Sequence, residues 1–373
     1  MKRIVLVGGG SGGHFYPLIA VAERLNGYRQ GGHQIELIYM GPDAYDVEAL
    51  RENGINFVYC PSGKQRKYFS ILNYLDIFKI LYGFLVAIVK LYRIYPDVIF
   101  SKGSYTSVPV VLAAWILRIP IVIHESDSRP GSANKLAAHF ARYIAISFDD
   151  VARFFPVQKI AHTGIPLRSV FSTISTNPLQ ELGLPSDKPL LFVTGGSLGA
   201  ERLNLLILSA LDELLPMFTI FHQTGSTHEA FMQSNAESKI NDTSLLDHYF
   251  VKGTLSGTEM NLAQQAATFI VSRAGAGSIF EIAQKGKPSI LIPIPEDVSH
   301  DQKSNAYAYA RTGACSVLEE KNFTDGLLTA EIIRIMTNQS VYDAMSDAAY
   351  AFGKTNAAQT IAQTLIDIGE EHT

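Results

Sequence analysis

The sequence predicts an α/β protein with two doubly wound parallel sheets, and three features of its 373 residues support this prediction. Short apolar runs alternate with segments of helical periodicity, which is typical of strands that are buried on both faces and joined by helices. The alternation starts again after residue 188. Each half also opens with an apolar run that leads into a glycine-rich turn, at residues 8–13 and 195–200.

The expected strands and helices follow from these runs in chain order. The strands of the first half are residues 4–7, 35–39, 98–100, 119–123 and 143–146, and those of the second half are 190–193, 219–222, 269–271 and 289–292. The clearest helices of the second half are residues 203–215, 278–285 and 302–311. Ser, Thr, Asn and Pro break the periodicity between residues 168 and 189. We therefore expect an N-terminal domain over residues 1–167 and a C-terminal domain over residues 185–351.

Composition excludes several classes of protein. The chain has 31 basic and 35 acidic residues, a formal charge of −4, which argues against a nucleic-acid partner. The 47% of hydrophobic residues and 18% of charged residues indicate a well-packed chain and not a disordered one. Two cysteines, Cys60 and Cys315, are too few for a disulfide scaffold or a zinc cluster, which favours a reducing compartment. The N-terminus lacks the apolar stretch of a signal peptide, so we expect that the protein is not exported.

Residues 68–95 form the most apolar region of the chain. Its longest uncharged run, residues 80–89, is well short of the ~18 residues that a spanning helix needs. Apolar side chains nevertheless cover most of the helix, and basic residues precede it at Lys64, Arg66 and Lys67. This pattern favours contact of residues 64–93 with a membrane surface or a lipid chain. Simple burial in the core is the alternative.

The first glycine-rich turn carries candidate chemistry at its end. Glycines between a strand and a helix allow a ligand to approach the backbone, and the helix start attracts anions. Residues 8, 10 and 13 fit G-x-G-x-x-G, but Asp43 comes too late to bind a dinucleotide ribose, so the turn could be purely structural. His14 follows directly and is a candidate base, or else a structural histidine at the helix start.

A second candidate group, residues 124–127, follows the expected strand 119–123. His124 stands beside two carboxylates there, Glu125 and Asp127. Carboxylates and imidazoles at the carboxyl end of a strand can act as bases. The alternative is that the acidic residues cap the next helix, which begins near Gly131.

The segment from Ser272 to Glu281 predicts an anion site in the second half. A strand ends at Ser272, small residues open a helix at about Ala276, and Glu281 lies one to two turns further along. A diphosphate at this helix start would place an attached ribose near the Glu281 carboxylate; a solvated glutamate is the alternative. Gln302 and Asn305 lie three apart on one helical face and suit the hydroxyls of a sugar, although polar surface residues often have this spacing.

Several motifs occur in a fixed order along the chain. They are residues 8–14, 101–105, 124–127 with Pro130, Gly131, Asn134 and Lys135, 164–168, 195–200, 272–281 and 300–305. With this ordered set the chain resembles, over nearly its whole length, the MurG family of transferases, which add N-acetylglucosamine to lipid-linked muramyl-pentapeptide in bacterial wall synthesis. The resemblance implies a GT-B fold, in which two Rossmann-like domains face each other across a cleft and a C-terminal helix, residues 352–373, packs back on the first domain.

The resemblance also implies roles for individual residues. UDP-N-acetylglucosamine is expected on the C-terminal domain, with Glu281 at the uridine ribose, and the lipid-linked muramyl-pentapeptide on the N-terminal domain. The substrate-binding residues that it implies are Ser11, Gly12, Gly13, Tyr105, Asp127, Asn134, Arg168, Ser197, Ala276, Gly277, Ser278, Ile279, Phe280, Glu281, Gln302 and Asn305. Ser197, Arg168 and residues 276–279 would face the diphosphate, and Gln302 and Asn305 would contact the sugar.

The implied reaction is an inverting transfer in one displacement, in which the muramyl C4 hydroxyl attacks the anomeric carbon as UDP leaves. His14 is the expected base, with Glu125 or Asp127 as substitutes. Helix dipoles and backbone amides would stabilise the diphosphate, so no tightly bound cofactor and no metal is expected. The expected location is the cytoplasmic face of the plasma membrane, with peripheral attachment.

The chain departs from the family at four positions. The family usually has asparagine at Asp127 and Ile165, glycine at Ser104, and a polar or basic residue at Leu198. A charged Asp127 near a diphosphate would be unfavourable unless it pairs with a cation or acts as the base. Three alternatives therefore stay open: a UDP-sugar transferase with another lipid-linked acceptor, an NAD-dependent oxidoreductase built on the first glycine turn, and a membrane-surface scaffold without turnover.

Overall fold

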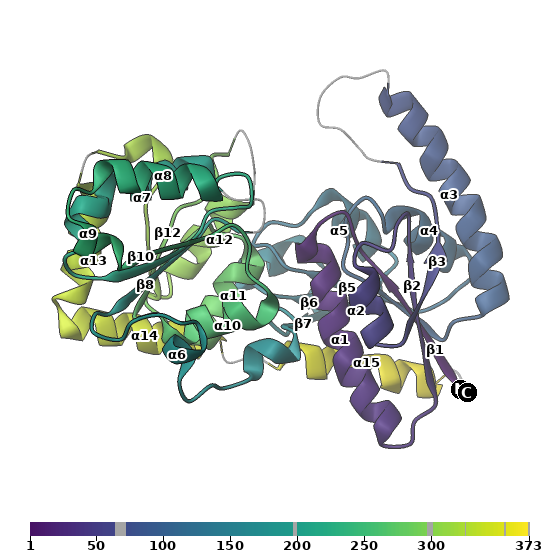
Figure 1. The fold of residues 1–373 in the computed structure, drawn as a ribbon. Coiled ribbons are helices and arrows are strands. Elements are labelled where there is room, and N and C mark those ends of the chain that lie inside the picture. The colour runs from purple at the N-terminus through teal and green to yellow at the C-terminus, as the bar shows by residue number, and fades with distance from the viewer. Residues whose placement is uncertain (64–71, 197–199, 297–300, 325, 354–355, 372–373) are drawn as a thin grey trace. The chain divides into compact units, whose positions relative to one another are not determined.

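In a computed structural model of the protein, the contacts divide the chain into two compact units, Met1–Ser169 with Asn356–Thr373, and Val170–Thr355. The structure describes residues 1–63, 72–196, 200–296, 301–324, 326–353 and 356–371, and for residues 72–77 only the backbone. Each unit contains one parallel sheet with helices on both of its faces (Figure 1). The predicted fold class, two parallel-sheet α/β units, is confirmed.

The sheet of the first unit has the strand order β3-β2-β1-β4-β5-β6-β7, with all neighbours parallel. Its strands are β1 (Lys2–Val7), β2 (Ile35–Gly41), β3 (Ile55–Tyr59), β4 (Val98–Ser101), β5 (Ile121–Glu125), β6 (Tyr143–Ile146) and β7 (Ile160–His162). The order reverses direction at β1, between β2 and β4. Ligands bind at the carboxyl ends of the strands beside such a reversal in doubly wound folds.

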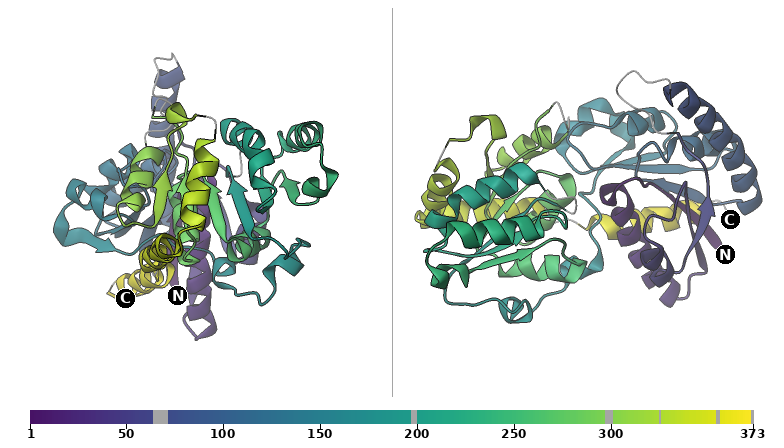
Figure 2. Two further views of the ribbon diagram at one scale, coloured as in Figure 1. Left: turned by 90° about the vertical axis from the view of Figure 1, so that its left-hand side faces the viewer. Right: turned by 45° about the horizontal axis from the view of Figure 1, so that its top comes forward.

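Helices of the first unit cover both faces of this sheet. They are α1 (Gly12–Gln30), α2 (Val47–Glu52), α3 (Leu72–Ile94), α4 (Val108–Ile116), α5 (Ser132–Ala138) and α15 (Ala357–Glu371), with 3-10 turns at Asp149–Phe154, Val157–Lys159 and Ser169–Ser172. Residues of α1, α2 and α15 share one buried cluster, and residues of α3, α4 and α5 share the other. Figure 2 shows α15, in yellow, along the first unit.

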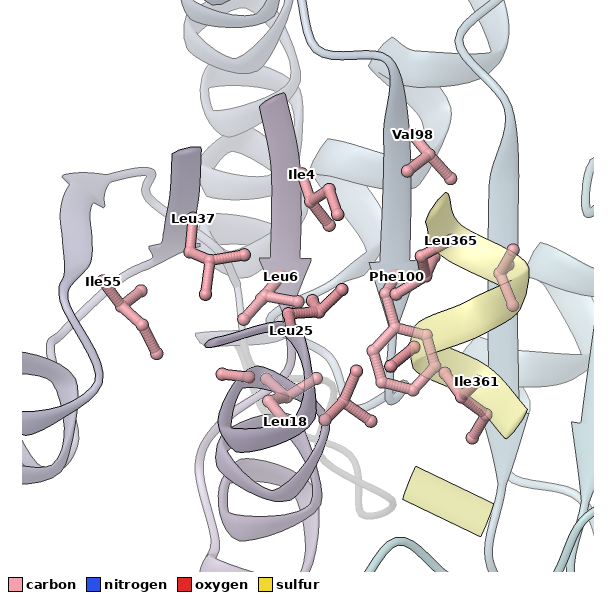
Figure 3. Packing of buried hydrophobic residues seen from close by; sticks show 14 of the residues in the cluster. Ile4, Leu6, Leu18, Leu25, Leu37, Ile55, Val98, Phe100, Ile361 and Leu365 are labelled. Atoms are coloured by element: carbon pink, nitrogen blue, oxygen red, sulfur yellow. The ribbon is translucent and has the colours of Figure 1, made fainter. Parts of the chain in front are cut away.

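The C-terminal helix α15 belongs to the core of the first unit. Ile361 and Leu365 lie against Phe100 of β4 (Figure 3), and both are at most 2% exposed. Burying each of these side chains contributes about 1.5–3 kcal/mol. At the C-terminal end of the helix, Glu370 pairs with Lys2 at 2.6 Å and Glu371 with Arg142 at 2.5 Å. The last helix is therefore an integral part of this unit.

The sheet of the second unit has the order β10-β9-β8-β11-β12-β13, again with parallel neighbours. Its strands are β8 (Leu190–Thr194), β9 (Thr219–Gln223), β10 (Tyr249–Lys252), β11 (Phe269–Ser272), β12 (Ser289–Leu291) and β13 (Cys315–Val317). Its helices are α6 (Pro178–Glu181), α7 (Glu201–Leu214), α8 (Glu229–Lys239), α9 (Thr243–Leu246), α10 (Gly257–Ala266), α11 (Ala276–Gln284), α12 (Gln302–Ala310), α13 (Leu327–Met336) and α14 (Gln339–Gly353), with a 3-10 turn at Glu320–Asn322.

The structure corrects one strand that the sequence analysis placed at residues 119–123. Strand β5 runs from Ile121 to Glu125, two residues later. Pro120 precedes it, and a proline has no N–H to donate to a neighbouring strand; its carbonyl accepts from the N–H of Ile99 at 2.9 Å. His124 and Glu125 are therefore the last residues of a buried strand and do not belong to the loop that follows it.

Gly353 allows close packing of α14 on α11, the helix that carries Glu281. A Cβ atom on Gly353 would lie 2.3 Å from the carbonyl carbon of Ala283 and 2.4 Å from the amide nitrogen of Gln284. Backbone atoms cannot yield as a flexible side chain can, so any side chain here forces the two helices apart.

We expect Gly353→Ala to lower the free energy of unfolding by about 1–3 kcal/mol, the range for overpacked cores. Urea denaturation measures this change. Gly27→Ala in α1 is the matched control, because a Cβ on Gly27 meets no atom within 4 Å. It should stabilise the protein by about 0.5–1 kcal/mol. Equal unfolding midpoints for Gly353→Ala and the wild type would refute the close-packing argument.

Candidate functional site

The first glycine-rich turn lies at the carboxyl end of β1, and its first three positions, residues 8–10, leave little room for a side chain. Gly8 has φ 153° and Gly10 has φ 78°. A Cβ on Gly8 would lie 2.9 Å from the Cβ of Lys102, and one on Gly9 would lie 2.6 Å from the Tyr39 hydroxyl. That hydroxyl donates to the Gly8 carbonyl at 2.8 Å. Ser11 is the N-cap of α1 and, with Gly13, is exposed.

His14 lies in the first turn of α1 and is half-buried. Its Nδ1 atom is 2.8 Å from the Ser11 hydroxyl. Burial and then the charge of Lys102 lower the pKa of the imidazole to about 3, so it is neutral at pH 7. When Nδ1–H donates to Ser11, the lone pair is on Nε2, which is the form that accepts a proton.

Glu125 is buried at the end of β5, and both of its carboxylate oxygens have partners in the loop that follows or in α5. They accept from the N–H of Asp127 at 3.1 Å, the N–H of Gly131 at 3.0 Å and the amide of Asn134 at 3.0 Å. Gly131 is the N-cap of α5. Burial raises the pKa of Glu125, and Lys102 partly offsets this. The geometry fits the capping alternative and disfavours Glu125 as a base, because its oxygens face inward.

His124 of β5 and Asn134 of α5 are also buried here, on either side of the loop that joins these elements. The Asn134 amide donates to the His124 carbonyl at 3.0 Å, and Asn134 is 4% exposed. The His124 ring contacts the Gly164 carbonyl at 2.8 Å, and burial followed by Lys102 lowers its pKa. The expectation that Asn134 contacts substrate therefore needs correction, because its side chain orders the end of β5.

Tyr105 and Asp127 stay partly exposed at the same edge of the sheet. The Tyr105 ring lies beside the glycine turn, 3.0 Å from where a Cβ on Gly10 would be. Ser104, which stands where the family has glycine, has φ 73°, a left-handed conformation that strains a residue with a side chain. Ile165, where the family has asparagine, is 3% exposed.

Arg168 lies in the loop that follows β7 of the first unit, and its side chain packs against α1, the helix after the glycine turn. Its guanidinium carbon is 4.4 Å from the centre of the Tyr16 ring, a cation–π contact. The neighbouring Ser169 N–H donates to Glu23 of α1 at 2.6 Å. Within its own unit, then, Arg168 adds positive charge beside α1.

The second glycine-rich turn follows β8. Thr194, the last residue of that strand, donates to the Gln223 side chain at 2.5 Å and accepts from the Gly196 N–H at 3.2 Å. Gly196 has φ 82°, which suits glycine alone. Ser197, with its neighbours Leu198 and Gly199, lies outside the described residues, as does His300 of the last motif.

The start of α11 forms the candidate anion site of the second unit. The helix begins at Ala276 after the N-cap Gly275. By helix geometry the N–H groups of Ala276, Gly277 and Ser278 have no acceptor within the helix. A Cβ on Gly277 would meet no atom within 4 Å, so the approach to these amides is open.

Ile279 and Phe280 do not belong to this anion site, which corrects the sequence analysis. The Ile279 N–H donates to the Gly275 carbonyl at 3.0 Å. Both side chains are at most 2% exposed, and the Phe280 ring packs 4.8 Å from the Phe352 ring. Their side chains point into the core, while those of Gly277, Ser278 and Glu281 are partly exposed, because a helix turns its successive side chains toward different sides.

Glu281 is half-buried on α11, next to a glutamine that the sequence analysis missed. Gln264 of α10 is 1% exposed, and its amide donates to Glu281 Oε2 at 3.1 Å. Lys285 lies one turn further along α11; burial lowers its pKa to about 8, and the charge of Glu281 acts in the opposite direction. One oxygen of Glu281 is thus fixed by a buried amide, which orients the carboxylate.

Gln302 and Asn305 do not form one open polar face. Gln302 is half-buried, and its side-chain oxygen accepts from the Ile294 N–H at 3.2 Å, so it holds the chain after β12. Asn305 is 0% exposed. The helical spacing was correct, but α12 directs Asn305 into the interior. Among the described residues, no cluster of three or more His, Cys, Asp or Glu could hold a metal ion.

Two family models match the chain. The glycosyltransferase family 28 N-terminal domain matches residues 4–146, and the C-terminal domain of that family matches residues 190–365. A UDP-N-acetylglucosamine--N-acetylmuramyl-(pentapeptide) pyrophosphoryl-undecaprenol N-acetylglucosamine transferase of Bacillus cereus is 35% identical over 97% of this chain and 99% of its own. A transferase of the same name from Borrelia hermsii is 32% identical over 98% of this chain and 96% of its own.

Solved structures share the whole fold. Acinetobacter baumannii MurG has a TM-score of 0.75 at 25% identity, over 98% of this chain and 100% of that one. A UDP-GlcNAc 2-epimerase from Neisseria meningitidis, bound to UDP-GlcNAc, has a TM-score of 0.70 at 15% identity, over 98% of this chain and 100% of that one, and shares the fold alone.

Proposed function

The chain belongs to glycosyltransferase family 28, and we propose that it transfers N-acetylglucosamine from UDP-N-acetylglucosamine to lipid-linked N-acetylmuramyl-pentapeptide. The observation that carries this proposal is the 35% identity, over 97% of the chain, to a transferase named for that reaction. The relationship extends across both units, and each unit supplies part of a reaction with two substrates.

We propose that the donor binds the second unit at the start of α11. Amides of residues 276–278 and the positive end of the helix dipole would stabilise the diphosphate as it leaves. Glu281, one turn further, would accept hydrogen bonds from the ribose hydroxyls while Gln264 holds its other oxygen. These groups supply charge stabilisation at the leaving group, so the proposed reaction has no resident metal.

We propose His14 as the base that deprotonates the acceptor. In one displacement the C4 hydroxyl oxygen bonds to the anomeric carbon, the bond to the UDP oxygen breaks, and the hydroxyl proton moves to His14 Nε2. A pKa of about 3 makes the free imidazole a weak base. The negative diphosphates of the bound substrates would raise this pKa, because an anion stabilises the imidazolium. Basicity would therefore increase once the substrates are bound.

The exposed face of α3 supports peripheral attachment to a membrane. Its apolar side chains are 49% to 73% exposed and lie on one stripe: Phe78, Leu81, Tyr82, Leu85, Val89 and Tyr92. On the opposite side Gly83, Ala87 and Leu91 are buried. No described helix has both the length and the hydropathy to cross a bilayer. We propose that this stripe (Phe78 to Tyr92) binds the cytoplasmic face of the plasma membrane, where a lipid-linked acceptor would be anchored.

Charged residues in the α3 stripe should weaken membrane binding. We expect Leu81→Glu with Leu85→Glu to lower binding to phospholipid vesicles at least about tenfold, because burying each leucine contributes about 1.5–3 kcal/mol. Cosedimentation with vesicles measures this. Val157→Glu is the control, since Val157 is 80% exposed in the same unit but outside the stripe. Vesicle binding of the double variant at the wild-type level would rule out the stripe as the membrane contact.

The proposed function is tested by incubating the purified protein with UDP-N-acetylglucosamine and a synthetic lipid-linked muramyl-pentapeptide. We expect UDP release together with an acceptor that has gained one N-acetylhexosamine by mass spectrometry. UDP-glucose and UDP-N-acetylgalactosamine serve as donor controls. Product from a different lipid-linked sugar only would favour the related-transferase alternative, and the absence of any product would favour a scaffold without turnover.

A further inference from the structure

Lys102 directly follows β4 and is a fully buried lysine at the carboxyl end of the first sheet, where the glycine turn leads from β1 to His14. It is 1% exposed and ranks among the largest buried side chains of the protein. Its N–H donates to the Val7 carbonyl at 2.8 Å, which fixes it beside the end of β1. A buried ammonium group is costly unless anions and hydrogen-bond acceptors surround it.

The partners of Lys102 come from the end of β5 and the loop after it. Its ammonium group donates to the Ser126 hydroxyl, and Ser126 stands between Glu125 and Asp127. Burial lowers the pKa of Lys102, while the charges of Glu125 and then Asp127 act in the opposite direction. The hydrogen bond to Ser126 brings the ammonium group to the chain between these two carboxylates, and their charges favour the ammonium form.

The hydrogen bonds of Glu125 indicate that its carboxyl group is ionised. All three partners, the N–H of Asp127, the N–H of Gly131 and the amide of Asn134, donate to it. An ionised carboxylate only accepts, whereas a protonated one would have to donate through one oxygen. A buried ionised carboxylate needs a cation, and the charge of Lys102, whose ammonium group donates to the neighbouring Ser126, acts on Glu125 in this sense.

Lys102 also links this loop to the glycine turn. A Cβ on Gly8 would lie 2.9 Å from the Lys102 Cβ and 3.1 Å from the His14 carbonyl oxygen, so Gly8 is between them. The ammonium group of Lys102 thus holds the loop after β5, and the aliphatic part of its side chain packs against the glycine turn that precedes His14.

We propose that Lys102 is a positioning residue for the acceptor: its buried ammonium compensates the carboxylates of Glu125 and Asp127 and, through Ser126, holds their loop against the glycine turn. This inference rests on the proposed function, in which the acceptor carries a pyrophosphate. An uncompensated Asp127 would repel that pyrophosphate, since like charges at close range in a partly buried site repel each other more strongly than in water. Lys102 is thus the cation that lets this chain carry an aspartate at position 127.

A double-mutant cycle tests the charge compensation. Lys102→Met keeps an unbranched apolar stem of similar length and removes the charge. We expect it to raise the acceptor KM at least about tenfold, while the donor KM changes less than about twofold. Asp127→Asn in the Lys102→Met background should restore most of the acceptor KM. If the acceptor KM rises in Lys102→Met and stays high in the double variant, Lys102 has a packing role only. If the acceptor KM of Lys102→Met is unchanged, Lys102 does not contribute to the site. Either result overturns the proposal.

Asp127→Asn alone keeps the proposal testable if Lys102→Met does not fold. Removing this anion while Lys102 remains should lower the acceptor KM several-fold. Glu370→Gln is the matched control, because it removes the same charge beside Lys2, at the amino end of strand β1 and away from the glycine turn. An acceptor KM that is unchanged or higher in Asp127→Asn overturns the proposal. So does a fall of kcat of more than about tenfold, which would make Asp127 the base.

Thermal unfolding of the four proteins of the cycle separates this inference from the proposed function. If the wild type forms no product, the proposed function fails. The charge compensation by Lys102 is then judged from the thermal unfolding midpoint. Lys102→Met should lower this midpoint, and adding Asp127→Asn should raise it part of the way back to the wild-type value. Without such recovery, the proposal fails independently of any activity.

Discussion

Replacing His14 with alanine is expected to lower kcat by about 10²–10⁴, the usual contribution of a positioned base. The KM values for donor and acceptor should change little, because the imidazole acts on the hydroxyl proton in the transition state and adds little to substrate binding. Steady-state kinetics with each substrate varied in turn measures both quantities. Full turnover by His14→Ala would assign the base to another group, with Asp127 the nearest candidate.

Ser11→Ala is the matched variant for this prediction. It keeps the imidazole but removes the hydroxyl that lies 2.8 Å from Nδ1, so we expect a smaller fall in kcat than for His14→Ala. A fall as large as that of His14→Ala would point to Ser11 itself as the essential group.

The pH dependence of stability follows from the same imidazole. A histidine has a pKa of about 6.5 in the unfolded chain, and the folded value for His14 is about 3. Below pH 6.5 the unfolded state binds a proton that the folded state does not, so His14 costs stability progressively as the pH falls toward 3, by up to about 1.4 kcal/mol per pH unit. His14→Ala should remove this part of the acid sensitivity.

Replacing Glu281 with alanine is expected to raise the KM for UDP-N-acetylglucosamine by about tenfold to 100-fold. Hydrogen bonds to a charged group are worth about 1.5–3 kcal/mol, and each 1.4 kcal/mol is a factor of ten. The acceptor KM should not change, because the proposed acceptor residues belong to the first unit. Donor KM values measured at saturating acceptor check the prediction.

Two further variants sharpen the test of Glu281. Glu281→Gln keeps the shape and loses the charge, so its donor KM should lie between those of the wild type and the alanine variant. Glu237→Ala is the control, because Glu237 is an exposed glutamate on α8 of the same unit. An unchanged donor KM in Glu281→Ala would eliminate the ribose role.

The sequence predicted the interior of both sheets well and missed their edges. The nine predicted strands correspond to β1, β2, β4, β5, β6, β8, β9, β11 and β12, which all have two neighbours. The missed strands, β3, β7, β10 and β13, are the four edges. An interior strand is apolar on both faces and stands out as a continuous run. In β3, by contrast, Asn56, Phe57 and Tyr59 are exposed, so the run is broken.

At the site, sequence reasoning located the loops but not the directions of the side chains. The two-residue shift of β5 turned Glu125 from a loop carboxylate into a buried cap of α5. Ile279, Phe280 and Asn305 lie in the right helices but face the core, because each position on a helix points in a direction that depends on its neighbours in space.

Lys102 and Gln264 were overlooked for a related reason. Both stand out only through partners far along the chain: Ser126 for Lys102 and Glu281 for Gln264. A buried polar residue has no local pattern of its own, since its role depends on the group that it contacts in the folded protein. For Lys102 the sequence signal was a lysine among small residues, whereas Gln264 is one of several polar residues of α10 and had no such signal.

The most direct test of the account is a crystal structure of the protein with UDP bound. We predict the diphosphate within hydrogen-bond distance of the backbone amides at residues 276–278 and the ribose hydroxyls on the carboxylate of Glu281. Isothermal titration of the same protein with NAD should show no binding. A nucleotide at the first glycine turn, or a Glu281 side chain that makes no contact with bound UDP, would contradict the assignment of the donor to α11.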